Sequence, residues 1–172
     1  MIKKLIICLI EWCLRIAPDK GFFLALRVLW AKQRGAIIGK NFRLLHGYRI
    51  FGYHLIEVGD NSVIADHCYI SLGPGDCKLR IGNDSNIGPE TYIRNANHKF
   101  EDSHIPIAKQ GHEAKDVTIG SDVWIGARCI LLGGTKLGDH SVLAAGSVIS
   151  FEVPTASIAA GNPARVIKKR ST

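Results

Sequence analysis

The sequence has few cysteines and no long apolar run near its start, and each shortage excludes a class of protein. Its five cysteines are odd in number and none forms a Cys-x-x-Cys pair, which argues against a disulfide framework or a zinc knuckle. A reducing, cytoplasmic compartment is therefore expected. The apolar run Leu5–Ile10 stops at Glu11, far below the ~20 residues that a membrane-spanning helix needs. No small-residue cleavage site of a secretion signal follows it.

Nucleic-acid-binding motifs are also missing, although the chain is basic. The formal net charge is +7. Residues 1–34 hold seven Lys or Arg against Glu11 and Asp19, which gives +5, and residues 165–170 add four cations, which leaves the middle at −2. Basic ends on a nearly neutral body predict anionic partners at those ends. These ends lack interleaved aromatic residues beyond Trp12 and Trp30, so nucleic acid is not an expected partner.

Residues 1–33 differ from the rest and predict two short helices. Apolar residues recur at helical spacing within residues 5–16 and 22–30, and Pro18 and Gly21 mark the break between the two stretches. Two interpretations stay open. The favoured one is an amphipathic helical pair that packs on the end of the domain or on a neighbouring subunit. The other is a basic amphipathic anchor on the inner face of the membrane, which would make the protein a peripheral membrane protein.

The stretch from Ile119 to Val153 carries a repeat of six residues. An aliphatic residue opens every hexad, a small residue follows in five of the six, and the fifth place holds Val123, Cys129, Thr135, Ser141, Ser147 and Val153. A period of six fits neither an α-helix nor simple strand alternation, but it matches hexapeptide β-helix repeats. Each hexad predicts one flat face, and three hexads predict a coil of 18 residues with the aliphatic side chains on the axis. The small fifth-place residues fill the corners, so Cys129, and Cys68 in the same register, are expected to be packed thiols.

The same repeat begins near Ile38 in a looser form and is interrupted twice. A short excursion at residues 73–77 breaks the register, and after Ile93 the register is lost until Ile119. The polar stretch in between, residues 94–117, is a long insertion of the kind that carries function in repeat proteins. By this count the chain has about four coils plus caps.

Four segments resemble the signature of the hexapeptide-repeat acyltransferases: WIGARCILLGG (124–134), LAAGSVI (143–149), EVP (152–154) and AAGNPARVIKK (159–169). The resemblance covers residues 38–169 and is strongest from Val117 onward. Within that superfamily the chain is similar to the galactoside and maltose acetyltransferases and to relatives that O-acetylate bacterial polysaccharides. The resemblance implies a left-handed parallel β-helix, a homotrimer, and acetyl-coenzyme A bound between neighbouring prisms.

Together these observations predict an all-β architecture that is preceded by a short helical N-terminal segment. Residues 1–34 form the amphipathic helical segment. Residues 35–172 form a left-handed parallel β-helix of about four coils, with an extended catalytic loop at 94–117 and a basic C-terminal tail.

The resemblance also implies a catalytic histidine at the start of the loop, where His98 follows Ile93 at the matching distance. Transfer of an acetyl group from a thioester to a hydroxyl requires removal of the hydroxyl proton, which an imidazole can accept at neutral pH. The same histidine would then protonate the departing sulfur, so neither an acyl-enzyme nor a nucleophilic Ser or Cys is needed. His104 and His112 share the loop but match no catalytic position, and solvated or structural roles are expected for them.

By the same resemblance the acetyl-coenzyme A site consists of Trp124, Gly126, Ala127, Ala145, Gly146, Ser150, Arg165 and Lys168. Small residues would let the pantetheine arm lie against the prism, and a backbone N–H near Gly126 or Ala127 would steady the developing oxyanion. Arg165 and Lys168 would meet the coenzyme A phosphates. Trp124 would form one wall of the tunnel that holds the thioester, or it would pack against another subunit of the trimer. No metal ligand is expected.

The acceptor residues are less well defined. His67 stands where relatives carry an asparagine near the acceptor sugar, and this departure puts the details of acceptor binding in doubt. Asn95 and Asn97 are further polar candidates, although asparagines in loops are often turn formers.

Several functions stay open. The favoured one is acetyl-coenzyme A-dependent O-acetylation of a sugar or glycan hydroxyl in the biosynthesis of a bacterial surface polysaccharide. N-acetylation of an amino sugar nucleotide is the alternative, because a histidine base serves an amine equally well. A γ-type carbonic anhydrase needs a His-x4-His zinc pair, whereas five residues separate His98 from His104. A non-catalytic β-helical subunit would need neither the GNPAR segment with its basic tail nor a histidine in the loop.

Overall fold

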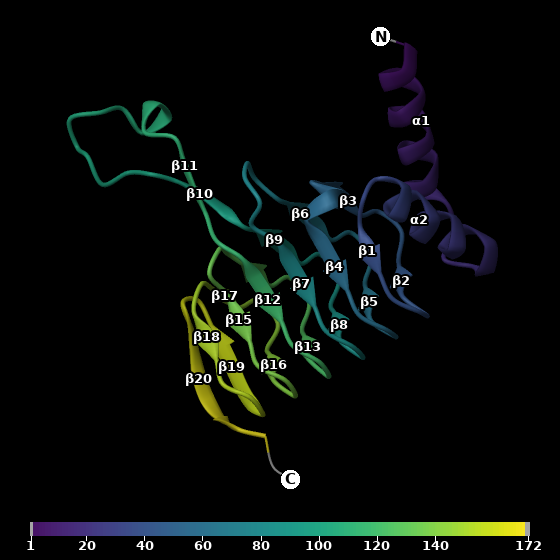
Figure 1. Cartoon of the computed structure of the whole chain (residues 1–172). Helices are drawn as coiled ribbons and strands as arrows, with labels where there is room; N and C mark the ends of the chain where they lie inside the picture. Colours follow the sequence, from purple (N-terminus) through teal and green to yellow (C-terminus); the bar gives the residue numbers. More distant parts are fainter. Residues whose placement is uncertain (1, 171–172) are drawn as a thin grey trace.

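The aliphatic residues that open the hexads stack into three columns in the computed structural model, which describes residues 2–170. The first column is Ile38, Val58, Ile81, Ile119, Leu137 and Val153. The second is Leu44, Ile64, Ile87, Ile125, Leu143 and Ala159. The third is Ile50, Ile70, Ile93, Leu131 and Ile149. These columns form a narrow core along the axis of a parallel β-helix, which confirms the predicted fold class (Figure 1).

Three sheets form the faces of the prism. The first face consists of β1 (Ile37–Ile38), β4 (Ile56–Val58), β7 (Leu79–Ile81), β12 (Val117–Ile119), β15 (Lys136–Leu137) and β18 (Glu152–Val153). The second consists of β2 (Arg43–Leu44), β5 (Val63–Ile64), β8 (Asn86–Ile87), β13 (Trp124–Ile125), β16 (Val142–Leu143), β19 (Ser157–Gly161) and the antiparallel β20 (Ala164–Lys169). The third consists of β3 (Arg49–Phe51), β6 (Tyr69–Ser71), β9 (Tyr92–Arg94), β14 (Ile130–Leu131) and β17 (Val148–Ile149).

The number of coils differs from the count made on the sequence. The first face has six strands and the third has five, where about four coils were expected. The early coils were undercounted because they are longer than 18 residues. A 3₁₀ turn, η1 (Tyr53–Leu55), lies between β3 and β4, and residues 73–77 lie between β6 and β7. These insertions sit at corners and leave the pairing of the strands intact.

The expected corner position of Val153 is wrong. Val153 pairs with Leu137 and is fully buried on the axis. The segment between Ile149 and Val153 is two residues shorter than a hexad, so the register shifts and Val153 takes the place that opens the next hexad.

The packed corner thiols are confirmed. Cys68 and Cys129 are buried, and their Sγ atoms lie 3.3 Å from the Gly88 carbonyl oxygen and 3.2 Å from the Ala144 carbonyl oxygen. Burial raises the pKa of the Cys68 thiol to about 12 and also raises that of Cys129. Both therefore stay protonated at neutral pH and are poor nucleophiles.

The two expected N-terminal helices are α1 (Ile2–Ile16) and α2 (Gly21–Gln33). Helix α2 covers the first coil, where Ala31 joins the core and Val28 and Trp30 pack against it. Helix α1 touches the prism only along its inner side, where the Tyr53 hydroxyl donates to Glu11 Oε1 (2.9 Å). No helix in the described part of the chain is long and apolar enough to cross a membrane.

The insertion between β9 and β12 is a hairpin that stands away from the prism (Figure 1). Its strands β10 (Ala96–His98) and β11 (His112–Ala114) pair antiparallel, and the 3₁₀ turn η2 (Ile107–Lys109) lies in the exposed loop between them. The hairpin places the start and the end of the loop side by side.

Candidate functional site

Four of the residues predicted to bind the coenzyme converge on one groove. Strand β13 pairs with β8 on one side and with β16 on the other, and the corners that follow these strands stack on one another. The groove has a volume of about 380 Å³, and among its lining residues are Trp124, Gly126, Ala127 and Ala145. The lining is mostly apolar, with backbone atoms between the side chains.

The small residues of this groove are imposed by the spacing of the coils. A Cβ added to Gly126 would lie 2.5 Å from the backbone nitrogen of Ala145 in the next coil, which no side chain allows. The fold therefore requires Gly126 whether or not a ligand binds. Gly146 is favoured for another reason, its φ of +71°, because a Cβ there would meet nothing within 4 Å. Open space beside Gly146 is what a bound ligand would need.

Trp124 stands at the rim of the groove. Its side chain projects outward from β13 and remains 61% exposed, although it is a large aromatic group. An indole in this position is free to cover a ligand that enters the groove.

Arg165 and Lys168 lie on the same sheet as the groove. They belong to β20, which continues the second face beyond β16 and β19. Both are exposed, and neither forms an ion pair with another described residue. The sheet therefore offers an apolar groove and two free cations farther along, a combination that fits a donor with an extended arm and phosphates. Ser150, in contrast, follows β17 on the third face and is not among the lining residues of the groove.

His98 is exposed on the projecting hairpin, directly opposite His112 in the pairing of β10 with β11. The centroids of the two imidazole rings are 4.2 Å apart. His98 does not line the groove of its own chain, so a single protomer does not bring the predicted base to the predicted coenzyme residues.

Asn95 anchors the root of this hairpin instead of facing solvent. It is fully buried, its Nδ2 donates to the Cys77 carbonyl (2.7 Å), and its Oδ1 accepts from the Gly73 backbone N–H (2.6 Å). Its carbonyl accepts from the Lys115 N–H (2.8 Å). Asn95 thus joins both ends of the hairpin to residues 73–77. Asn97 is exposed and lies opposite Glu113.

His67 belongs to a polar cluster at the corner after β5. Ligand-capable atoms of His46, Asp66 and His67 all lie within 4.8 Å of one another, and the rings of His46 and His67 are 5.0 Å apart. His67 is held at φ +57°, and its N–H donates to the His46 carbonyl (3.0 Å). A Cβ on Gly47 would lie 2.3 Å from His67 Nδ1, so only glycine permits the ring to lie there.

The N-terminal helices contribute to the same cluster. His46 Nδ1 lies 2.7 Å from Asp19 Oδ2, and Asp19 also pairs with the buried Arg27. Burial alone would raise the pKa of Asp19, but the hydrogen bonds from His46 and Arg27 outweigh it, so the pKa lies below its ordinary value. Asp19 is therefore an anion at neutral pH and fixes the orientation of the His46 ring.

Asp19, His46 and Asp66 belong to this cluster, although the repeat pattern did not predict them. One signal was available, because His46 precedes Asp66 by the length of one early coil, and the corners of successive coils stack. Asp19 gave no such signal, because it lies outside the repeat.

Comparison with known proteins gives matches along most of the chain. Residues 116–150 match the bacterial transferase hexapeptide family (six repeats). A putative lipopolysaccharide biosynthesis O-acetyl transferase of Escherichia coli is 33% identical over 150 residues, which cover 81% of this chain and 75% of that protein. A putative acetyltransferase of Saccharomyces cerevisiae is 39% identical over 115 residues, which cover 66% of this chain and 56% of that protein.

The chain spans a smaller part of other relatives, such as 31% of a probable acetyltransferase of Mycobacterium tuberculosis. Among solved structures, a galactoside acetyltransferase in complex with coenzyme A has a TM-score of 0.78 at 25% identity, and the match covers 98% of this chain and 81% of that one. A hexapeptide-repeat acetyltransferase of Vibrio cholerae complexed with acetyl-coenzyme A has a TM-score of 0.75 at 25% identity, covering 92% and 84% of the two chains.

Proposed function

The chain belongs to the hexapeptide-repeat acyltransferase family, and on that premise we propose that it transfers the acetyl group of acetyl-coenzyme A to a sugar hydroxyl in the synthesis of a bacterial surface polysaccharide. The observation that carries the proposal is the groove of Trp124, Gly126, Ala127 and Ala145 on the same sheet as two free cations. The relative named for lipopolysaccharide O-acetylation supports the choice of acceptor class.

In this proposal the residues of β13 and its corner hold the donor. Trp124 covers the thioester end, and the Ala127 N–H donates to the carbonyl oxygen as negative charge develops there. The N–H of Gly126 is not available, because it donates to the Leu143 carbonyl (2.8 Å). Arg165 and Lys168 bind the phosphates of the donor. Bound acetyl-coenzyme A supplies the activated acyl group.

His98 is the proposed general base. It accepts the proton of the sugar hydroxyl as the hydroxyl oxygen bonds to the thioester carbonyl carbon, and it returns the proton to sulfur as the carbon–sulfur bond breaks. Both of its tasks need an exposed imidazole that a substrate can reach, which the hairpin provides. The buried thiols of Cys68 and Cys129 take no part.

The cluster of Asp19, His46, Asp66 and His67 is the proposed acceptor site. Asp66 makes no side-chain hydrogen bond to another described residue, so its carboxylate is free to accept from sugar hydroxyls. Imidazole and carboxylate groups together offer donors and acceptors, which suits a polyol. Asn97 is the second proposed contact, from the hairpin.

A homotrimer belongs to the same proposal. His98 lies apart from the groove of its own chain, and the hairpin loop exposes Phe100 (68%), Ile105 (44%) and Ile107 (55%). Apolar side chains on a projecting loop are stabilised by packing on another surface. A neighbouring protomer that receives the loop would bring His98 to a groove and complete the site.

The test is release of free thiol from acetyl-coenzyme A in the presence of candidate acceptors, both neutral sugars and amino sugar nucleotides. We expect turnover with hydroxyl acceptors and a loss of about 10²–10⁴-fold for His98→Ala, the usual contribution of a general base. His104→Ala in the same loop is the matched control. Acetylation of amino sugars alone would show that the acceptor group is an amine and not a hydroxyl. Near wild-type turnover of a folded His98→Ala protein would refute the role of His98.

A further inference from the structure

The outer face of α1 is an uncovered apolar stripe. Leu5, Leu9, Trp12 and Ile16 follow one another at helical spacing along one side and are 71%, 60%, 56% and 61% exposed. Side chains of this size are rarely left in water in a continuous row, because removal of their apolar surface from water is favourable. The stripe therefore requires a partner surface.

The inner side of α1 is already occupied, which fixes the direction of the stripe. The Arg15 carbonyl accepts from the Gly47 N–H (2.7 Å), and Glu11 accepts from the Tyr53 hydroxyl. These contacts hold the helix against the first coil. The apolar stripe consequently points away from the prism.

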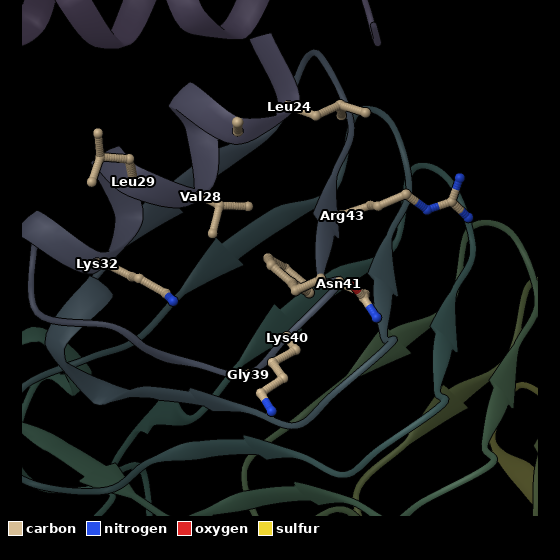
Figure 2. Close-up of a pocket in the computed structure, with 10 residues that line it drawn as sticks. Leu24, Val28, Leu29, Lys32, Gly39, Lys40, Asn41 and Arg43 are labelled. Atoms are coloured by element: carbon tan, nitrogen blue, oxygen red, sulfur yellow. The ribbon is translucent and has the colours of Figure 1, made fainter. Parts of the chain in front are cut away.

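A second feature lies at the same end of the molecule, between α2 and the turn that precedes β2 (Figure 2). This groove has a volume of about 720 Å³, and its apolar lining includes Leu24, Val28, Leu29 and Phe42. Lys32, Lys40 and Arg43 also line it, and none of them forms an ion pair with another described residue. An apolar groove with three free cations suits a ligand that is both apolar and anionic.

Charge decides between the partners that could cover these features. The two acids of residues 1–34, Glu11 and Asp19, are both engaged inside the molecule, with Tyr53 and with Arg27 and His46. Asp60 is the acid beside the groove, where its Oδ1 accepts from the Lys40 backbone N–H (2.6 Å). The exposed cations outnumber it, so a second copy of the same face would be repelled. An anionic phospholipid supplies acyl chains for the stripe and phosphates for the cations.

We propose that this end of the prism, the outer face of α1 together with the groove beside α2, docks on the surface of an anionic phospholipid membrane. Trp12 lies in the middle of the stripe, and indole rings favour the interface between headgroups and acyl chains. The helix lies in the interface and does not cross the bilayer.

Docking here would have a consequence for the acceptor, which rests on the proposed function. Asp19 lies between α1 and α2 and bonds to His46, so the proposed acceptor cluster is at the foot of the membrane-binding helix. An acceptor glycan that is itself anchored in the lipid would then be presented directly to the cluster.

The test is co-sedimentation of the full-length protein with vesicles of phosphatidylcholine, with and without about 30% phosphatidylglycerol. We expect binding to the anionic vesicles, reduced at least tenfold in Leu5→Ser/Leu9→Ser/Ile16→Ser and by added salt. Ile167→Ser, which alters a comparably exposed aliphatic residue on β20 at the other end of the prism, should bind as wild type does. Lys32→Gln/Lys40→Gln should weaken binding more than the matched pair Lys136→Gln/Lys169→Gln.

Oligomer mass and acetyl transfer to a soluble acceptor are measured on the same triple variant. Unchanged mass and unchanged turnover, with lost vesicle binding, would support the proposal. Wild-type protein that fails to bind anionic vesicles would overturn it, as would a triple variant that binds equally well. A triple variant with altered oligomer mass would overturn it too, because α1 would then be a subunit contact. Absence of acetyl transfer in the wild type would refute the proposed function and leave the vesicle result to be judged separately.

Discussion

The imidazole ring of His98 packs on that of His112 across the hairpin, with 4.2 Å between ring centroids. In the proposed mechanism His112 is a positioning residue, because a ring packed against His98 limits the orientations that the proposed base can adopt. The two residues are cross-strand partners, so the contact is built into the pairing of β10 with β11.

The first prediction concerns this contact. His112→Ala should lower kcat several-fold and leave KM for acetyl-coenzyme A unchanged, because the base loses its orientation while the donor groove is untouched. His112→Phe, which keeps an aromatic ring, should restore most of the activity. Steady-state kinetics on both variants check this. Equal losses in the Ala and Phe variants would mean that ring packing is not what His112 provides.

The second prediction concerns the sharing of the site between protomers. His98→Ala and Ala145→Phe should each be nearly inactive, the first without a base and the second with a blocked groove. Co-expression of the two chains should restore activity, because some interfaces then combine an intact His98 with an intact groove. The measurement is turnover of mixed oligomers separated by different tags. Mixed oligomers without recovered turnover would place the whole site within one chain.

The third prediction concerns the root of the hairpin. Asn95→Ala should lower the stability of the fold by about 1–3 kcal/mol, since it removes the fully buried side chain that bonds the Gly73 N–H and the Cys77 carbonyl of two half-buried residues. Urea unfolding followed by circular dichroism measures the change. Asn97→Ala, at an exposed position two residues on, is the control and should stay within about 0.5 kcal/mol of wild type. A comparable loss in both variants would argue against a special role for Asn95.

The fourth prediction concerns acid stability. The pKa of Asp19 lies below its ordinary value of 3.8 because the hydrogen bonds from His46 and Arg27 outweigh the effect of burial. A carboxyl whose pKa is lower in the folded than in the unfolded state stabilises the fold at pH values above its unfolded pKa. This contribution is lost as the pH falls through its folded pKa. Asp19→Asn should therefore flatten the decline in stability below about pH 4.

Urea midpoints at a series of pH values test this, with the exposed Asp76→Asn as the control. An acid limb that is equally steep in wild type and Asp19→Asn would show that the ion pair with Arg27 does not contribute to acid unfolding.

The columns of the core could be predicted from the sequence because their period is strict. Ile119, Ile125 and Leu131 face the axis as the hexads require. Val153 was misplaced because one short turn changes the phase, and nothing in the local sequence marks it. The number of coils was underestimated because insertions also change the phase of the repeat. The turn η1 and residues 73–77 lengthen the early coils without altering the pairing of their strands.

The site was harder to predict, because it depends on contacts between distant segments. Trp124 and Ala145 line the same groove because the corners of successive coils stack, which the repeat predicts. The bond between Asp19 and His46 joins a helix to the first coil, and no periodic pattern encodes it. Asn95 was a candidate for acceptor binding, and only the approach of residues 73–77 explains its burial.

The hairpin leaves the prism after β9 and returns at β12, yet β12 pairs with β7 in register, Ile81 beside Ile119, as though nothing had been inserted. The length and composition of the hairpin can therefore change without moving any residue of the core. In the proposed mechanism, mutations of His98 and Asn97 are separated in this way from mutations that threaten folding. The part of the hairpin between the paired residues Ala96 and Ala114 could be exchanged as a unit for that of another chain of the same architecture, while Asn95 keeps its anchoring bonds.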